Sequence, residues 1–323
     1  MSFGTVGVML ALVKSRWLSV AAVLAACGGE PSSGLDSPSP DADASTTPAD
    51  ADWPPIATDA KLYTSDGQAY AVTEVGAAID HALRNQADNV ILYVHGRACG
   101  GGGEPMKSLG EAVPNMEAGY SAAVVMLVWP GADDSCPLGF PEAKARASGG
   151  GITQTLRSFA AYKAQGHGAG VKFTFITHSM GSLVLEASAL ANGSAGLPTN
   201  LFENIIINSG ASAAADHATW ANALTFAPVA FVTVNDGDNV LRLAGNGRLG
   251  RSVDGATLAP RITYVDFTAN NVNHAYYLPS GQKGDGMKAF YQTVMNGKPF
   301  VFTGAAGTQE QRNGATIYHF NGQ

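Results

Sequence analysis

Ser179 lies where the amino-acid pattern changes, within "FITHSMGSLV" (175–184). Strand-favouring residues run up to Thr177-His178, and the helix-favouring run "SLVLEASAL" begins directly after Gly181. A serine hydroxyl is a weak nucleophile at neutral pH, and it is activated when a nearby histidine takes its proton and a carboxylate orients that histidine. The pattern therefore leads to the hypothesis of a nucleophile on a tight strand-to-helix turn.

Such a turn needs small residues on both sides of the serine, because the strand and the helix approach each other closely there. Gly181 supplies the second small position, whereas Thr177 stands at the first, where the motif has glycine. This departure makes the five-residue pattern less specific. The strand-like residues before the serine and the helical run after it support the hypothesis, because they put the serine at the right junction.

A possible base and a possible acid follow the serine in the chain. His274 lies in the polar loop "NNVNHAYYLPS" (270–280), after the last strand-like run before the C-terminal segment. Asp236 and Asp238 follow the preceding run and are two residues apart, so in an extended loop both side chains would point the same way. The residues alone leave the choice between these two aspartates open.

The other histidines are expected to be satisfied or exposed side chains without a catalytic part. His95, at the "HG" turn, is expected to shape the backbone, and His178, beside the serine, is expected to point away from it. The other four are His81, His167, His217 and His319.

The elements that must position these residues alternate along the chain. Near-continuous apolar runs predict strands within 89–97, 121–131, 170–179, 202–210, 228–238 and 261–271. Helix-compatible stretches cover about 73–86, 142–166, 181–191, 213–225 and 285–296. This alternation predicts an α/β fold with a mostly parallel central sheet flanked by helices. Ser179, both aspartates and His274 would then meet at the carboxyl edge of the sheet. The C-terminal stretch 299–320 could form a terminal hairpin.

Five short segments in this order carry a resemblance to a known family: "VHGR" (94–97), "VWPG" (128–131), "THSMGS" (177–182), "NDGDNVL" (235–241) and "NHAYY" (273–277). Together they resemble bacterial α/β-hydrolases, serine esterase or lipase-like proteins of a poorly characterised family with an "HSMG" nucleophile elbow. The resemblance spans roughly residues 60–297. It implies the α/β-hydrolase fold, with Ser179 as nucleophile, His274 as base and Asp238 as acid, because the family's Asp-x-x-Leu pattern is here "DNVL". The short segment between Ser209 and Pro228 predicts a minimal lid or none.

Acyl transfer also needs two backbone N–H groups that face the developing negative charge. Met180, the residue after the nucleophile, is expected to supply one of them. The loop after "VHG" is expected to supply the other, from Arg97 or from its neighbour Ala98. The glycines of "CGGGG" (99–103) are interpreted as loop and not as a phosphate cradle, because no Lys-Ser/Thr pair follows them.

The N-terminus is typical of an export signal over residues 1–26. Lys14 and Arg16 precede an apolar stretch, 17–26, that is too short to span a membrane. "LAAC" (24–27) resembles the lipobox of bacterial lipoproteins, which implies cleavage before Cys27 and lipidation of its sulfur; an ordinary signal peptide with a chance cysteine is the alternative. Gly28 resembles the residue of an outer-membrane-directed signal. The expected location is therefore the bacterial cell envelope, at the outer membrane.

Residues 27–55 are rich in Pro, Ser, Asp and Ala, and they carry six acids and no bases. Such a stretch buries too little apolar surface to order itself, so it is predicted to be a disordered tether to a hydrolase domain of residues 56–323. Because the signal adds two bases, only −3 of the net charge of −7 falls to that domain. A near-neutral domain argues against nucleic acid as a partner.

Lipidation of Cys27 would leave Cys99 and Cys136 as an even pair. In an exported protein an even pair favours a disulfide, and two unrelated small apolar residues are the alternative. "ADDSC" (132–136) lacks the spacing of a metal site, and no motif calls for a cofactor. The leading prediction is a lipid-anchored serine hydrolase of carboxylic esters. The alternatives are an acyltransferase that uses the same triad and a non-catalytic envelope lipoprotein that keeps the fold.

Overall fold

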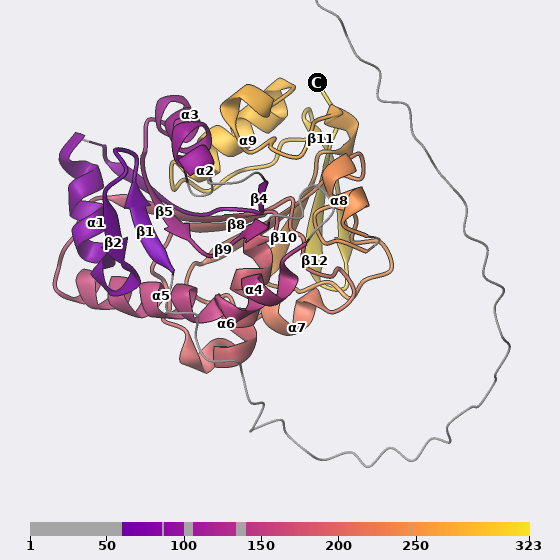
Figure 1. Cartoon of the computed structure of the whole chain (residues 1–323). Coiled ribbons are helices and arrows are strands. Elements are labelled where there is room, and N and C mark those ends of the chain that lie inside the picture. The colour runs from indigo at the N-terminus through magenta and orange to yellow at the C-terminus, as the bar shows by residue number, and fades with distance from the viewer. Residues whose placement is uncertain (1–59, 86, 100–105, 134–139, 246) are drawn as a thin grey trace, which may run out of the picture. The chain divides into compact units, whose positions relative to one another are not determined.

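The computed structural model describes residues 60–85, 87–99, 106–133, 140–245 and 247–323 (Figure 1). Within these residues one ten-stranded sheet has the order β11-β12-β10-β9-β8-β7-β3-β5-β1-β2. In chain order its strands are β1 (Lys61–Thr64), β2 (Ala69–Ala71), β3 (Asn89–Val94), β5 (Ala123–Val128), β7 (Lys172–His178), β8 (Asn204–Asn208), β9 (Val229–Val234), β10 (Ile262–Asp266), β11 (Gly307–Arg312) and β12 (Ala315–Phe320). Two short strands, β4 (Ala98–Cys99) and β6 (Ala132–Asp133), pair with each other.

The centre of the sheet is parallel, and antiparallel strands stand at both edges. Each pair from β5 through β3, β7, β8, β9 and β10 runs parallel, and β12 continues parallel beside β10. Strand β1 is antiparallel to β5, and β11 is antiparallel to β12. Every residue of β3 and β5 is buried, as expected for strands covered on both faces.

Helices cover the two faces of the sheet as separate layers (Figure 1). Packed on one face are α1 (Val75–Ala82), α5 (Gly149–Ala164), α6 (Gly181–Gly196) and α7 (His217–Ala221). Packed on the other are α3 (Ala112–Tyr120) and α9 (Asp285–Met295). The remaining short helices are α2 (Met106–Gly110), α4 (Glu142–Ala147) and α8 (Asn239–Leu243), and 3₁₀ turns lie at Val72–Glu74, Leu83–Asn85, Thr268–Asn270 and Pro279–Gly281.

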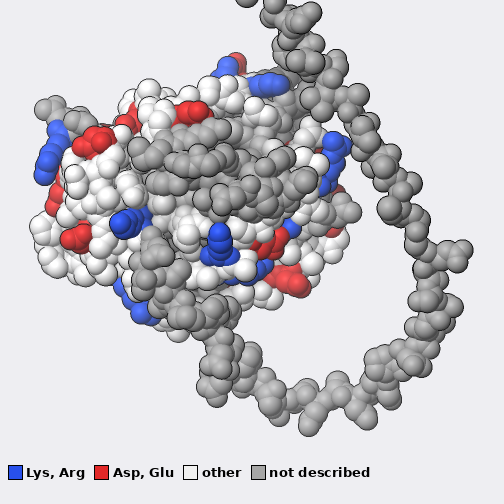
Figure 2. Space-filling view, in the orientation of Figure 1, with Lys and Arg blue, Asp and Glu red and all other residues white. Residues whose placement is uncertain are grey.

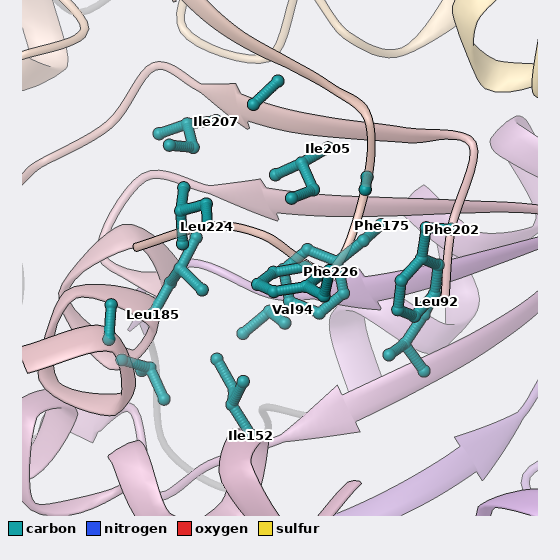
Figure 3. Close-up of a cluster of buried hydrophobic side chains, with 14 of the residues drawn as sticks. Leu92, Val94, Ile152, Phe175, Leu185, Phe202, Ile205, Ile207, Leu224 and Phe226 are labelled. Atoms are coloured by element: carbon teal, nitrogen blue, oxygen red, sulfur yellow. The ribbon is translucent and has the colours of Figure 1, made fainter. Parts of the chain in front are cut away.

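Alternation along each strand divides the hydrophobic core between the two layers. In β3, Leu92 and Val94 face the layer that contains α5 and α6, whereas Ile91 and Tyr93 face α3 and α9. Figure 3 shows the first layer, where Leu92 and Val94 lie near Phe175, with Ile152 of α5 below them and Leu185 of α6 to the left. The central strands are therefore fixed from both sides, which makes their carboxyl ends a rigid platform.

The six predicted strands are confirmed, with ends trimmed by up to five residues. The predicted helix over 142–166 is wrong as a single element, because it divides at Ser148 into α4 and α5. The predicted helix over 213–225 shortens to α7. Helices α2, α3 and α8 were not predicted. The C-terminal hairpin forms, and its second strand also joins the sheet beside β10.

Several expectations concern residues outside the described part of the chain. They are the signal over 1–26, the lipidation site Cys27, the tether over 27–55 and Cys136, so the structure describes none of them. None of the helices within the described ranges is both long and apolar enough to cross a bilayer. On the face drawn in Figure 2, acidic and basic side chains of the described surface are interspersed, without a broad area of one sign.

Candidate functional site

Ser179 occupies the sharp turn between β7 and α6. Its φ of 52° lies in the left-handed region, which an L-residue adopts at an energetic cost. Three backbone hydrogen bonds hold this conformation: the Ser179 N–H donates to the Asn208 carbonyl at 3.0 Å, and the Ser179 carbonyl accepts from Ser182 and from Ala211, each at 3.1 Å. The turn is therefore fixed by its own helix and by the end of the neighbouring strand β8.

Close packing explains the small residues around the turn. A Cβ atom at Gly181 would lie 2.7 Å from the Val94 carbonyl oxygen and 2.8 Å from that of His95, so no larger residue fits without a backbone shift. A Cβ atom at Gly96 would lie 2.9 Å from the Ser179 Cβ. Thr177, where the motif has glycine, is fully buried within β7. The turn therefore forms with Thr177 at the position where the motif has glycine.

His274 and Asp238 form a hydrogen-bonded pair. Nδ1 of His274 lies 2.7 Å from Oδ2 of Asp238, whose side chain is fully buried. The other carboxylate oxygen, Oδ1, accepts hydrogen bonds from the backbone N–H groups of Val240 and Leu241, both at 3.0 Å, and so caps the N-terminus of α8. These hydrogen bonds fix the orientation of the Asp238 carboxylate, so that Oδ2 faces the imidazole of His274.

Asp236 occupies a different environment. Its side chain is largely exposed, and its Oδ1 lies 2.5 Å from Nη2 of Arg251. The two aspartates therefore do not point the same way. The reason is that Asp238 is the N-cap of α8, so the loop turns between them instead of continuing extended. Of the two candidates, only Asp238 contacts His274.

The backbone of His274 is held as firmly as its ring. Its carbonyl accepts hydrogen bonds from the Ser209 hydroxyl at 2.9 Å and from Nε2 of His178 at 3.3 Å. The His178 ring lies 4.6 Å from the His274 ring and 4.7 Å from that of Tyr277. His178 therefore packs against the candidate base, a contact that the sequence did not indicate.

His178 stays neutral in this position. Burial, together with the nearby His274, holds the pKa of His178 well below its ordinary value. A neutral ring that donates through Nε2 places no second positive charge beside His274. Sequence reasoning missed this contact and that of Ser209, although both residues stand at the carboxyl ends of predicted strands.

Nε2 of His274 is buried and has no hydrogen-bond partner among the described residues. His274 and Ser179 line the same cavity, of about 110 Å³. A buried imidazole nitrogen without a partner is uncommon in a folded protein, and catalysis is one of the roles that keep such a nitrogen open. Nε2 of His274 is therefore available as a proton acceptor, and His274 lines the same cavity as Ser179.

Met180 and Arg97, the two residues expected to supply the oxyanion donors, also line this cavity. Met180, the residue before α6, is buried, and its N–H donates no hydrogen bond within the described residues. Arg97 lines the same cavity, and its guanidinium carbon lies 4.5 Å from the centre of the Phe140 ring. Both residues predicted to supply the oxyanion donors therefore border the cavity that contains Ser179.

His95 secures the loop that carries Arg97. Its Nδ1 donates to the Gly96 carbonyl at 2.6 Å, and its Nε2 accepts from the Trp129 N–H at 3.3 Å. The Trp129 indole N–H donates to the His95 carbonyl at 2.8 Å, and the two rings stack 5.4 Å apart. Burial lowers the pKa of His95 to about 4, so this ring is neutral at pH 7. Its contacts are those of a residue that shapes the loop.

The predicted cysteine pair is only partly described. Cys99 ends β4, whose partner β6 lies shortly before Cys136 in the chain. The side chain of Cys99 and the whole of Cys136 lie outside the described residues. No group of three or more His, Cys, Asp or Glu side chains within the described ranges is arranged to hold a metal ion.

The candidate residues follow three different strands of one parallel sheet: Ser179 follows β7, Asp238 follows β9 and His274 follows β10. A serine on a strand-to-helix turn, then an acid, then a histidine is the chain order of one fold in particular. The chain has the α/β-hydrolase fold. The segment between β8 and β9 contains only the short helix α7, so no long insertion stands at the position where such folds often carry a lid.

No protein-family model matches the chain, and no curated protein matches it either. Solved structures that it resembles include a hyperthermophilic esterase from the archaeon Pyrobaculum calidifontis, with 13% identity, coverage of 64% of this chain and 75% of that chain, and a TM-score of 0.34. Carboxyl esterase 2 from the fungus Tuber melanosporum gives 16% identity, coverage of 64% and 75%, and a TM-score of 0.36. A Rhizomucor miehei esterase gives 13% identity, coverage of 66% and 73%, and a TM-score of 0.37.

Proposed function

We propose that this protein is a serine hydrolase that cleaves carboxylic esters through an acyl-enzyme intermediate. The observation that carries the proposal is the His274–Asp238 pair, in which His274 lines the same cavity as Ser179 and its Nε2 is buried without a partner among the described residues. A structural histidine would have both ring nitrogens engaged, as His95 does.

In the proposed reaction the Ser179 hydroxyl attacks the ester carbonyl carbon while Nε2 of His274 takes its proton. Asp238 accepts a hydrogen bond from Nδ1–H of His274 and stabilises the imidazolium that forms. The tetrahedral intermediate then collapses, the bond to the alcohol oxygen breaks, and His274 gives its proton to the departing alcohol. Water repeats these steps on the acyl-enzyme, which releases the acid and restores Ser179.

The negative charge of the tetrahedral intermediate requires donors that are already in place. We assign this role to the backbone N–H groups of Met180 and Arg97, two residues that line the same cavity as Ser179. Each donor of this kind lowers the barrier by roughly 3 kcal/mol. Helix α6 begins at Gly181, so its dipole also favours negative charge near the Met180 N–H.

Hydrolysis of p-nitrophenyl acetate by the purified protein tests the proposal. Wild-type protein should release p-nitrophenol, and Ser179→Ala should reduce kcat by at least ~10⁴-fold, because the nucleophile is removed while the fold is kept. Ser158→Ala, which removes a half-buried hydroxyl of α5 that donates to the Thr73 carbonyl, serves as the matched control and should keep full activity.

Two results would overturn the proposal. Absence of hydrolysis by the wild-type protein would favour the non-catalytic envelope lipoprotein, and undiminished hydrolysis by Ser179→Ala would place the nucleophile elsewhere. Product analysis in the presence of glycerol separates the acyltransferase alternative, because a transferase forms mainly the glycerol ester whereas a hydrolase releases mainly free acid.

A further inference from the structure

Two cavities meet at His274. The first, of about 110 Å³, contains Ser179, and the second, of about 360 Å³, extends along the loop that carries His274. His274 and Val240 line both of them. In acyl transfer the departing alcohol takes its proton from the catalytic histidine, so it must leave on the side of that histidine. The second cavity is therefore placed to receive the alcohol part of an ester, and the first its acyl part.

The cavity at Ser179 is small and mostly apolar. Among the residues that line it are Phe140, Ala211, Leu241 and Ala244. At about 30 Å³ for each non-hydrogen atom, the share of one water molecule in the liquid, its volume accommodates roughly three or four atoms. This space suits an acetyl to butyryl group and excludes a long fatty acyl chain from the pocket.

The cavity beyond His274 is more polar. Polar groups make up about half of its lining, and no carboxylate stands among the described residues that form it; the carboxamide, hydroxyl and ammonium groups come from Asn239, Asn271, Asn273, Ser280, Gln282 and Lys283. A carboxamide both donates and accepts hydrogen bonds, which matches the two capacities of an alcohol hydroxyl. Pockets for apolar ligands are instead lined mainly by hydrophobic and aromatic side chains.

The side chains of two of these residues, Asn239 and Asn271, are available to bind a ligand. Asn239 and Asn271 are exposed, and neither side chain makes a hydrogen bond to another described residue. Each is fixed by its backbone: Asn239 is the first residue of α8, and Asn271 has a φ of 48° and a carbonyl that accepts a hydrogen bond from Nζ of Lys283 at 2.5 Å. Asn273 differs, because its Oδ1 already accepts from the Ala275 N–H.

We propose that the substrates are esters of a short-chain carboxylic acid with a hydroxyl-rich alcohol such as a sugar, and that Asn239 and Asn271 bind the hydroxyls of that alcohol. This inference rests on the proposed function and specifies its substrate class. The size of the cavity, about 360 Å³, falls at the lower end of the range for small-molecule sites and admits one sugar ring.

A matched pair of esters tests the inference. Methyl 6-O-acetylglucopyranoside and cyclohexylmethyl acetate share the acyl group and a six-membered ring, but only the first carries ring hydroxyls. The wild-type kcat/KM should be about tenfold or more higher for the sugar ester. The double variant Asn239→Ala/Asn271→Gly should lower this ratio about tenfold, since two hydrogen bonds are lost. Glycine is chosen at 271 because it adopts the positive φ without strain.

Asn222→Ala removes an exposed carboxamide at the end of α7 and should leave the ratio unchanged. Each single variant should show part of the loss, which separates binding from a folding defect in the double variant. A hexanoyl sugar ester should be hydrolysed at least about tenfold more slowly than the acetyl ester.

The substrate class is overturned if the wild type hydrolyses cyclohexylmethyl acetate as well as the sugar ester, if the double variant keeps the wild-type ratio, or if the hexanoyl ester is equally good. These failures are distinct from failure of the proposed function. In the latter case p-nitrophenyl acetate, the sugar ester and cyclohexylmethyl acetate would all remain intact, and the inference would fall with the function.

Discussion

Asp238 shows how one buried side chain serves two neighbours. One carboxylate oxygen caps α8 and the other holds His274, so the position of the base depends on the position of a helix N-terminus. Asp236 instead pairs with Arg251 at the surface. A surface pair of this kind contributes little to stability. The two aspartates therefore differ in their partners: Asp238 contacts His274, and Asp236 contacts Arg251.

Asp238→Asn should reduce kcat on p-nitrophenyl acetate by about 10⁴-fold, because an amide in place of the carboxylate favours the wrong tautomer of His274. The asparagine oxygen still caps α8, so the free energy of unfolding should change little. Asp236→Asn should lower kcat less than about threefold, because its carboxylate makes no contact with His274, and it is the matched control. A larger loss for Asp236→Asn than for Asp238→Asn would reverse the assignment.

At the same scale, the sequence indicated the three residues that the structure brings together but not all of their neighbours. Chain order and strand ends were enough to select Ser179 and His274. The choice of Asp238 depended on a family resemblance, because "NDGD" places two carboxylates within one loop. The contact of His178 could not be predicted from a local pattern, since His274, its partner, lies 96 residues away in the chain.

At the scale of elements, the buried strands could be predicted and the short helices could not. Strands covered on both faces are continuous apolar runs, which is a strong pattern. Helix α3 contains Pro114 and Gly119 within nine residues, and the packing of its buried face against β5 and the 3₁₀ turn Pro279–Gly281 outweighs this weak helix propensity. The pairing of β12 with β10 joins segments about 50 residues apart, and no local pattern encodes such a contact.

We propose a disulfide between Cys99, which ends β4, and Cys136, which follows β6 in the chain. Strands β3 and β5 are neighbours in the sheet, and β4 and β6 pair in the loops that follow them. The bridge would close a loop of about 38 residues and stabilise the fold by roughly 3–4 kcal/mol. Thiol titration of the mature, denatured and unreduced protein should find no free Cys99 or Cys136, whereas two titratable thiols would refute the bridge.

At the scale of the whole molecule, buried neutral histidines make stability depend on pH. Burial lowers the pKa of His95 to about 4, and it lowers those of His178 and His217 as well. In the unfolded chain these residues return to a pKa near 6.5. Between about pH 4 and 6.5 the unfolded state therefore binds more protons than the folded state, and stability falls as the pH falls through this range.

Urea unfolding at pH 7 and pH 5 measures this effect. Wild-type protein should lose free energy of unfolding on acidification, with about 2 kcal/mol of the loss due to His95. His95→Gln keeps a polar side chain but does not titrate, so its loss between the two pH values should be smaller by about that amount. Equal losses in both proteins would show that His95 is not the buried neutral group described here.

We also propose that Cys27 anchors the protein to the cell envelope by lipidation, with residues 27–55 as tether. A single acyl chain binds membranes weakly, whereas a multiply acylated cysteine anchors stably. Cys27→Ala should therefore move the protein from the membrane fraction to the soluble fraction of exporting cells, while its ester hydrolysis persists. A variant that still sediments with membranes would contradict the anchor.

The central claim is that Ser179 is a nucleophile activated by His274, and covalent trapping tests it most directly. A fluorophosphonate reacts with activated serines and leaves a stable phosphonyl group on the oxygen. Intact-mass and peptide analysis should find one adduct per chain, on the peptide that contains Ser179. Labelling should be absent in Ser179→Ala and much slower in His274→Ala. An unlabelled wild-type chain, or an adduct on another serine that persists in Ser179→Ala, would contradict this account.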